Sequence, residues 1–179
     1  MTALEIEGCL ESISVLVDTR ERPTGRQSEQ RLRCFGCPWE RRKLDYGDYT
    51  YNFILPNGRL LWLPSDEIKP SVSIERKMGL EELSTCFTRD RKRFEAEFER
   101  AVLNNATVYL LVENATWENL INGKYDTRFN PKAFLASLTA YMARYNIKPV
   151  FCKAETSGKL IKEILYRELK ERLERGEYG

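Results

Sequence analysis

Short apolar runs divide the chain into segments that predict strands. Ile13–Val17 is largely β-branched and is expected to form a buried strand that ends at Asp18. Thr107–Val112, followed by Glu113, predicts a second buried strand, and Lys148–Cys152 predicts another short one. Two of these predicted strands therefore carry an acid at their carboxyl end.

Residues 43 to 75 predict a meander of further strands. The expected strands are Lys43–Asp45, Tyr49–Leu55, Arg59–Leu63 and Val72–Glu75. Asn57-Gly58 lies between two of them and predicts a hairpin turn, because both residues tolerate positive φ. The meander places two carboxylates, Asp48 and Glu75, on neighbouring strands.

The other segments carry helical periodicity. Leu80–Asn104 predicts one long helix, because its apolar residues recur at three- and four-residue steps or multiples of them. Asn130 followed by Pro131 is an N-cap with proline at the first helical position, and opens a helix to about Tyr145. Thr156–Arg175 predicts the last helix through its stripe of Leu and Ile.

The order of these elements predicts an α/β layered fold with a mixed central sheet flanked by helices. The chain has 179 residues, of which 42% are hydrophobic and 31% charged, and this fits a single domain spanning residues 1–179. Ligands of such sheets prefer the carboxyl ends of strands, where the acids of this chain are expected.

Composition excludes several classes of protein. The longest apolar stretches, such as Val108–Val112, are too short to cross a bilayer, and the N-terminus lacks the features of a signal peptide. Five cysteines at irregular spacing do not form the paired framework of a small secreted domain, which indicates reduced thiols. We therefore expect a cytoplasmic protein without a membrane partner.

The polar stretch after Asp18 contains Pro23, Gly25, Gly36 and Pro38 and predicts a mobile or ligand-facing loop without regular structure, whereas strands are favoured from Trp39 onward. Between Asp18 and Lys43 the chain has eight Arg or Lys against four acids, although its net charge is only +2. Arg20 and Arg22 are candidates for contact with DNA phosphates. A merely solvated loop explains the same charges, so both interpretations stay open.

The candidate chemistry lies in Asp48, Glu75 and Lys77. Hydrolysis of a phosphodiester requires an activated water and neutralisation of a negatively charged transition state, and a divalent metal held by carboxylates supplies both. Magnesium fits best, because it prefers oxygen ligands and keeps several waters. Two carboxylates and a backbone carbonyl, assigned to Arg76, suffice to hold it.

Side-chain alternation along the predicted strand separates the roles within Glu75-Arg76-Lys77. Glu75 and Lys77 point to one face, so Lys77 can orient the attacking water or stabilise the developing charge. Arg76 points to the other face and is expected to brace the site through a buried ion pair. The alternative is an ordinary charge run on an exposed strand.

These residues resemble the XPF family of structure-specific endonucleases, within the PD-(D/E)xK nuclease superfamily. Three segments carry the resemblance in chain order, namely Val17–Glu21 (VDTRE), Gly47–Tyr49 (GDY) and Ile74–Lys77 (IERK). The resemblance runs through most of the chain. It implies a restriction-endonuclease-like three-layer core, dependence on Mg²⁺ or Mn²⁺, and cleavage of branched DNA such as flaps, forks or junctions.

The resemblance also assigns roles to single residues. It implies that Asp48 and Glu75 bind metal and that Lys77 is catalytic. Asp18, Glu21 and Arg76 would support the site. The family places an acid four residues after the motif lysine. Here Glu81 has that spacing, whereas Glu82 directly precedes a leucine as the family's acid does, so the role of either stays open.

Family members commonly carry a tandem helix-hairpin-helix module, for which this chain has no segment after its last predicted helix. Recognition of a branch would then come from a partner subunit, from a homodimer or from its own loops. A short, stand-alone version fits a phage or other mobile-element protein in a bacterial cell.

Several other features have competing interpretations. Cys34 and Cys37 have the spacing of half a zinc site, but a tetrahedral site needs four ligands and the chain has no histidine. Arg89 and Arg93 are candidate DNA contacts from the long helix, whose acids could instead pair with them. The aromatic side chains Trp39, Tyr46 and Tyr49 could stack on an unpaired base or pack in a hairpin.

The leading hypothesis is a metal-dependent endonuclease that acts on branched DNA or on DNA with single-stranded segments. The alternative is a non-catalytic nuclease-fold subunit that binds DNA or scaffolds an active partner. The intact Asp48, Glu75 and Lys77 argue against this alternative. A sequence-specific restriction enzyme is a third and weaker reading, because the R-E and E-R-K features favour the XPF branch.

Overall fold

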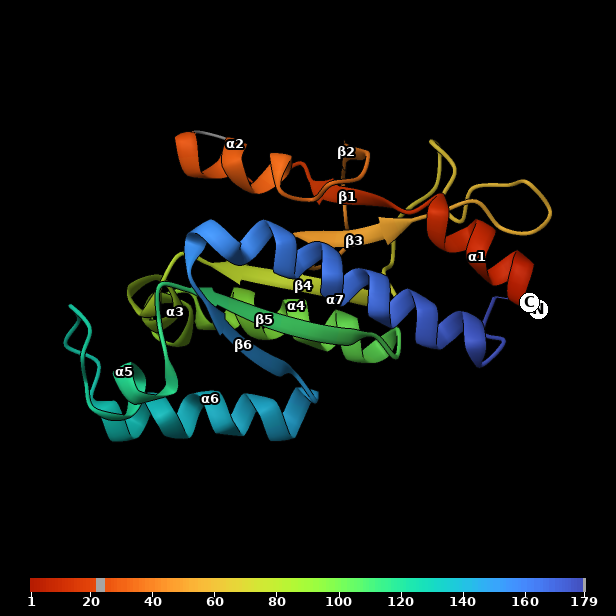
Figure 1. Cartoon of the computed structure of the whole chain (residues 1–179). Coiled ribbons are helices and arrows are strands. Elements are labelled where there is room, and N and C mark those ends of the chain that lie inside the picture. The colour runs from red at the N-terminus through yellow and green to blue at the C-terminus, as the bar shows by residue number, and fades with distance from the viewer. Residues whose placement is uncertain (22–24, 179) are drawn as a thin grey trace.

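The computed structural model describes residues 1–21 and 25–178, and the strands within them form one six-stranded sheet. The strands are β1 (Ser14–Asp18), β2 (Trp39–Arg42), β3 (Tyr49–Asn52), β4 (Val72–Lys77), β5 (Thr107–Glu113) and β6 (Lys148–Cys152). Their order across the sheet is β2-β1-β3-β4-β5-β6 (Figure 1). The pairs β1–β2, β4–β5 and β5–β6 are parallel, whereas β3 runs antiparallel to β1 and β4. The expected mixed sheet is confirmed.

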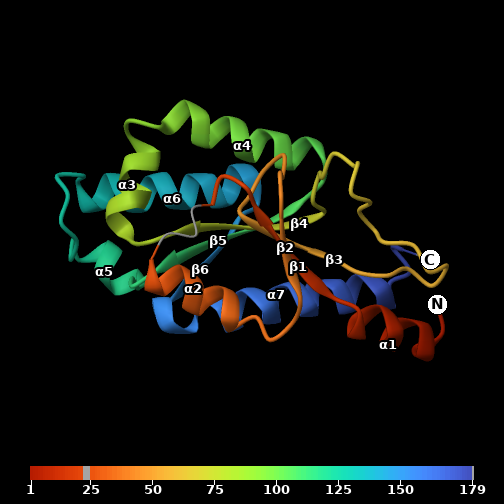
Figure 2. The same cartoon turned by 90° about the horizontal axis from the view of Figure 1, so that it is seen from above.

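Helices cover both faces of this sheet. They are α1 (Ala3–Glu11), α2 (Arg26–Arg33), α3 (Leu80–Phe87), α4 (Arg91–Leu103), α5 (Trp117–Ile121), α6 (Pro131–Tyr145) and α7 (Ala154–Glu174). Seen from above, α3, α4 and α6 lie on one side of the sheet, and α1, α2 and α7 lie on the other (Figure 2). A core rich in aromatic residues, which includes Phe94 and Phe98, fills the first interface, and a core with more aliphatic residues, which includes Ile161 and Leu165, fills the second. The three-layer α/β architecture follows the prediction.

Several elements begin and end close to their predicted positions. β1, β5 and β6 match the apolar runs from which they were predicted, and β4 extends the expected strand to Lys77. α6 opens with the predicted cap, since the Asn130 side chain accepts a hydrogen bond from the backbone N–H of Ala133. Within the described residues, no helix combines the length and the apolar character that a bilayer span requires.

The predicted helix from residue 80 to 104 is wrong as a single element, because the chain breaks between α3 and α4. The Thr88 hydroxyl donates to the carbonyl of Ser84, and the backbone N–H of Asp90 donates to the carbonyl of Thr85. The apolar face continues across the break, with the rings of Phe87 and Phe94 in edge-to-face contact at 5.8 Å. Periodicity of apolar residues therefore could not reveal the turn.

The prediction of an irregular loop after Asp18 is also wrong, because residues 26–33 of this stretch form α2. β2 lies in the region from Trp39 onward where strands were expected, although it precedes the strand predicted at Lys43–Asp45. α2 has the sequence RQSEQRLR and presents almost no apolar stripe. β2 pairs with β1, although most of its side chains are exposed. Backbone pairing and a buried arginine stabilise these elements, and neither produces a hydrophobic pattern.

The predicted meander is shorter than expected. Residues 59–63 form no strand, and only an isolated bridge joins Ile54 to Leu60. Residues 43–45 likewise contribute only a bridge, between Leu44 and Ile68. The turn at Gly58 does form, with a φ of 80°. Sequence analysis also missed α1 and the short α5, which carry weak apolar periodicity.

Gly158 of α7 allows α2 to lie directly against α7. A Cβ atom at this position would be 2.2 Å from the carbonyl oxygen of Arg31. Because real Cβ atoms do not approach a backbone oxygen so closely, any larger residue at this position would push α2 away. Glycine at this position is therefore required by packing rather than by its own backbone conformation.

Replacing Gly158 by Ala is expected to lower the free energy of unfolding by about 1–3 kcal/mol, because α2 must move. A thermal melt should show a fall in Tm of about 2–4 °C for each kcal/mol. Gly8→Ala in α1 is the matched control, because nothing lies within 4 Å of the added Cβ. An unchanged Tm for Gly158→Ala would show that α2 does not lie against α7 as described.

Candidate active site

The turn that carries Asp48 is wedged between β1 and β4. Gly47 has a φ of 74°, and a Cβ on it would be 2.6 Å from the Cβ of Ser73 in β4. The Asp48 backbone N–H donates to the carbonyl of Ile74 at 2.8 Å, and its carbonyl accepts from the N–H of Asp18 at 2.8 Å. Contacts on both sides thus fix the backbone from which the Asp48 side chain projects.

The Asp48 carboxylate lies beside the end of β4. One of its oxygens accepts a hydrogen bond of 2.7 Å from the backbone N–H of Arg76. Asp48 is partly exposed, whereas Glu75 is buried, with only 4% of its surface exposed. The predicted pair of carboxylates is therefore assembled by the antiparallel pairing of β3 with β4.

Glu75 and Lys77 project to the same face of β4, as side-chain alternation predicts. The Lys77 ammonium is 2.5 Å from Oε1 of Glu75 and lies 5.3 Å from the centre of the Phe94 ring. Oε2 of Glu75 is buried and has no hydrogen-bond partner among the described residues. A buried carboxylate oxygen without a partner is costly, so it requires an explanation.

The electrostatic balance of the site favours a bound cation. Burial raises the pKa of Asp48 well above its usual range, and the negative charges of Glu75 and Glu21 raise it further. Burial also raises the pKa of Glu75 to about 7, although the Lys77 ammonium opposes this effect. Two crowded carboxylates that resist ionisation can both ionise when a cation neutralises them.

The residues present fit a divalent metal with oxygen ligands. Asp48 and the free oxygen of Glu75 would supply two ligands, and Mg²⁺ or Mn²⁺ held in this way would keep several waters. Within residues 1–21 and 25–178, no group of three or more His, Cys, Asp or Glu is placed to hold a metal ion. The described residues therefore provide no third or fourth ligand for zinc near Cys34 and Cys37.

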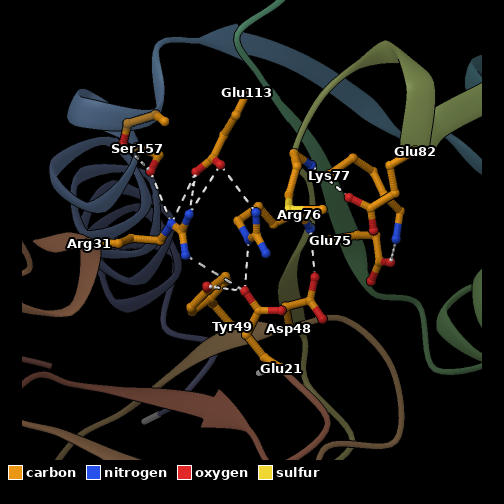
Figure 3. Close-up of polar contacts among 12 residues, drawn as sticks. Glu21, Arg31, Asp48, Tyr49, Glu75, Arg76, Lys77, Glu82, Glu113 and Ser157 are labelled. Carbon is orange, nitrogen blue, oxygen red and sulfur yellow. Dashed lines mark hydrogen bonds and ion pairs between the residues drawn. The ribbon is translucent and has the colours of Figure 1, made fainter. Parts of the chain in front are cut away.

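A second, separate charge cluster lies on the opposite face of β4 (Figure 3). The Arg76 guanidinium donates from Nε to Glu21 at 2.7 Å and from Nη1 to Glu113 at 3.1 Å. Arg31 of α2 donates to both oxygens of Glu113, at 3.0 and 3.1 Å. Arg76 thus makes the buried ion pairs that its position in the strand predicts. We call these four residues the ion-pair square.

The ion-pair square ties β4 to the neighbouring strand β5 and to the helix layer formed by α2 and α7. Nε of Arg31 also donates to the hydroxyl of Ser157 in α7, at 3.1 Å. The Tyr49 hydroxyl donates to Glu21 at 2.8 Å. Arg31 and Glu113 have side chains only 4% and 1% exposed, so their charges depend on each other rather than on water. Arg31 was not among the candidate residues, because a single arginine in a polar segment gives no signal of burial.

Asp18 is a structural carboxylate. Its oxygens accept hydrogen bonds from the Arg20 guanidinium at 2.8 and 3.1 Å and from the backbone N–H of Leu44 at 2.8 Å. Its carboxylate therefore already has partners and organises the chain that leads into the Asp48 turn. Arg41, one of the basic residues between Asp18 and Lys43, also holds this part of the chain. Its guanidinium donates hydrogen bonds to the backbone carbonyls of Thr19 and Glu21.

Residues 17–164 match the family model described as the ERCC4 domain. The chain belongs to the ERCC4 domain family. The expected XPF-type nuclease domain is thereby confirmed.

Solved structures share the fold of this ERCC4 domain. "XPF from Aeropyrum pernix" is 21% identical with a TM-score of 0.58, and the match covers 87% of this chain and 61% of that one. "XPF from Aeropyrum pernix, complex with DNA" is 24% identical with a TM-score of 0.57, and the match covers 88% and 65%. The ERCC4 domain described here thus spans less than two thirds of either chain. No curated protein matches its sequence.

Glu81 and Glu82, the two glutamates that follow Lys77, make different contacts. Glu82 accepts a hydrogen bond from the backbone N–H of Met78 at 2.8 Å and so secures the chain directly after Lys77. Glu81 is exposed and accepts from the N–H of Asp126 at 2.9 Å, in the connection between α5 and α6. Glu82 is the one that lies at the site.

The arginines predicted to contact DNA differ in how exposed they are and in where they lie. A cleft of about 580 Å³ opens beside the ion-pair square, with Arg20 and Arg93 among the side chains that line it. The Arg93 and Arg89 side chains are each 82% exposed, and the nearest carboxylate, that of Asp90, is 3.5 and 4.0 Å away. Arg22 lies outside the described residues.

Among the aromatic candidates, Tyr46 and Tyr49 are buried, which favours packing over stacking on a base. The Tyr46 hydroxyl donates to the carbonyl of Pro70, and Tyr49 packs edge-to-face against Phe35. Trp39 is 42% exposed on the edge strand β2.

Replacing Arg31 by Met is expected to destabilise the ERCC4 domain by about 3 kcal/mol, because Glu113 loses one of its two buried cations. Thermal melts should show a fall in Tm of about 6–12 °C. The exposed neighbour Arg33→Met is the control and should change stability by less than about 0.5 kcal/mol. Equal effects of the two substitutions would show that the ion-pair square contributes little.

Replacing Asp48 by Asn should stabilise the metal-free protein. The amide oxygen can still accept from the Arg76 N–H, while the repulsion with Glu75 disappears. In a chelator, Tm is expected to rise by about 2–4 °C, which corresponds to about 1 kcal/mol. Asp126→Asn, at an exposed position, is the control and should leave Tm unchanged. A lower Tm for Asp48→Asn would contradict repulsion between the carboxylates.

Proposed function

We propose that this ERCC4 domain is a divalent-metal-dependent endonuclease that hydrolyses phosphodiester bonds in branched DNA, such as flaps, forks or junctions. The observation that carries the proposal is the pair of Asp48 and Glu75, with a buried oxygen of Glu75 left without a partner next to Lys77. Membership of a nuclease family supports the reaction class. The DNA complex of a protein with the same fold supports DNA as the substrate.

Asp48 and Glu75 would hold Mg²⁺ or Mn²⁺, assisted by the backbone carbonyl of Arg76. When bound, the metal supplies an activated water and neutralises charge on the phosphate. Lys77 remains protonated, because its neighbouring carboxylates raise its pKa and outweigh the opposing effect of burial. Its ammonium can therefore orient the attacking water or stabilise negative charge as it develops.

Arg76 and Glu21 act through position. They lie on the far face of β4 from Glu75, and their ion pair fixes the strand whose N–H groups and side chains define the site. Arg20, Arg22, Arg89 and Arg93 are proposed to contact the DNA backbone. Asp18 is proposed to organise the Asp48 turn.

Cleavage of labelled flap, fork, Holliday-junction and linear duplex DNA tests this function. We expect Mg²⁺ or Mn²⁺ to support incision of a branched substrate at least about tenfold faster than of the linear duplex, and a chelator to abolish it. Lys77→Met should reduce the rate by about 100- to 10,000-fold, because a positioned charge is lost. Asp126→Asn should cleave as the wild type does.

Two outcomes would count against the proposal. Equal cleavage by the wild type and an Asp48→Ala, Glu75→Ala double variant would remove the assigned mechanism. DNA binding without cleavage under every metal condition would instead favour a non-catalytic subunit that scaffolds an active partner.

A further inference from the structure

Glu97 is a carboxylate on the side of α4 that faces the sheet. It lies three residues after Phe94 and four before Ala101, both of which are buried. Glu97 itself is half-buried, and its Oε1 accepts a hydrogen bond of 3.2 Å from the backbone N–H of Gly47. An acid at an inward helix position is unusual, because burial of a charge without a cation is unfavourable.

The contact reaches the turn that presents Asp48. Gly47 lies too close to Ser73 of β4 to carry a side chain, and Glu97 holds the same residue through its backbone N–H. One helical turn earlier, Phe94 of the same helix lies over the Lys77 ammonium. α4 therefore contacts the site at both the aspartate and the lysine.

The charge of Glu97 also acts on the site. The hydrogen bond of Glu97 to the Gly47 N–H brings a negative charge to the residue that directly precedes Asp48. Within residues 1–21 and 25–178, Glu97 forms no ion pair of its own. The carboxylates of Asp48 and Glu75 share the ammonium of Lys77, and one buried oxygen of Glu75 has no partner. The charge of Glu97 acts on the Arg20 guanidinium, which is itself bonded to Asp18, so Glu97 adds negative charge that no cation of its own offsets.

Resting on the proposed function, we propose that Glu97 is a third carboxylate of the metal site. Its Oε1 positions the Gly47–Asp48 turn. Its negative charge strengthens the binding of the cation although Glu97 does not coordinate it directly. The described side chains place no three acids around a single point, so Glu97 would act through metal-bound water. The competing view is that Glu97 holds the turn and its charge is irrelevant.

Two substitutions separate these roles. Glu97→Gln keeps an oxygen that can accept from Gly47 but removes the charge, whereas Glu97→Ala removes both. Glu99→Gln, at an exposed position of the same helix, is the matched control. Binding of Mn²⁺ alone is measured by titration calorimetry and by the electron paramagnetic resonance signal of free Mn²⁺.

We expect Glu97→Gln to raise the Kd for Mn²⁺ about tenfold, as loss of an outer-shell partner does. Its kcat at saturating Mn²⁺ should approach that of the wild type. Glu97→Ala should show the same loss of affinity and also a lower kcat that more Mn²⁺ does not restore. Glu99→Gln should match the wild type in both measurements.

A wild-type Kd for Glu97→Gln would overturn the electrostatic role, and equal kcat values for Glu97→Gln and Glu97→Ala would overturn the positioning role. These failures leave the proposed function intact, provided that the wild type binds Mn²⁺ and the Asp48→Ala, Glu75→Ala variant does not. Absence of Mn²⁺ binding by the wild type would overturn both proposals.

Discussion

The alternation of side chains along β4 is the constraint on which the other features depend. Glu75 and Lys77 project toward α4, and Arg76 projects toward α2 and α7. A single strand therefore carries two charge systems that do not touch, an excess of acids on one face and the balanced ion-pair square on the other. The backbone N–H of Arg76 connects them through its hydrogen bond to Asp48.

The two charge systems differ in whether the cost of burying their charges is offset within the protein. In the ion-pair square, two guanidinium groups face two carboxylates, so burial is compensated within the protein. On the other face, the negative charges of Asp48 and Glu75 repel each other and only the Lys77 ammonium offsets them. Oε2 of Glu75 has no hydrogen-bond partner among the described residues. The protein thus holds a destabilised site rigidly in place by surrounding it with satisfied interactions. Such an arrangement suits a site that gains stability only when it binds a cation.

Sequence patterns predicted the parts of the fold whose stability comes from apolar burial or local capping. β1, β5 and α6 followed their patterns, and the order of the XPF-like motifs identified Asp48, Glu75 and Lys77 as one site. The α3–α4 turn was hidden because apolar periodicity continues across it. α2 was hidden because its contacts are a buried arginine and a close backbone approach, which depend on residues more than 80 positions away.

The link between α2 and α7 has a consequence for the order in which the protein acquires its structure. Arg31 bonds Glu113 and Ser157, at separations of 82 and 126 residues along the chain. Such distant contacts close slowly, since a long loop must lose its conformational freedom before they form. During synthesis, the ion-pair square cannot be completed until Glu113 has left the ribosome, and the bond from Arg31 to Ser157 forms only after the start of α7 has followed. β4 is therefore braced only well after its own synthesis, and a nascent chain carries Asp48, Glu75 and Lys77 before it has the support that aligns them.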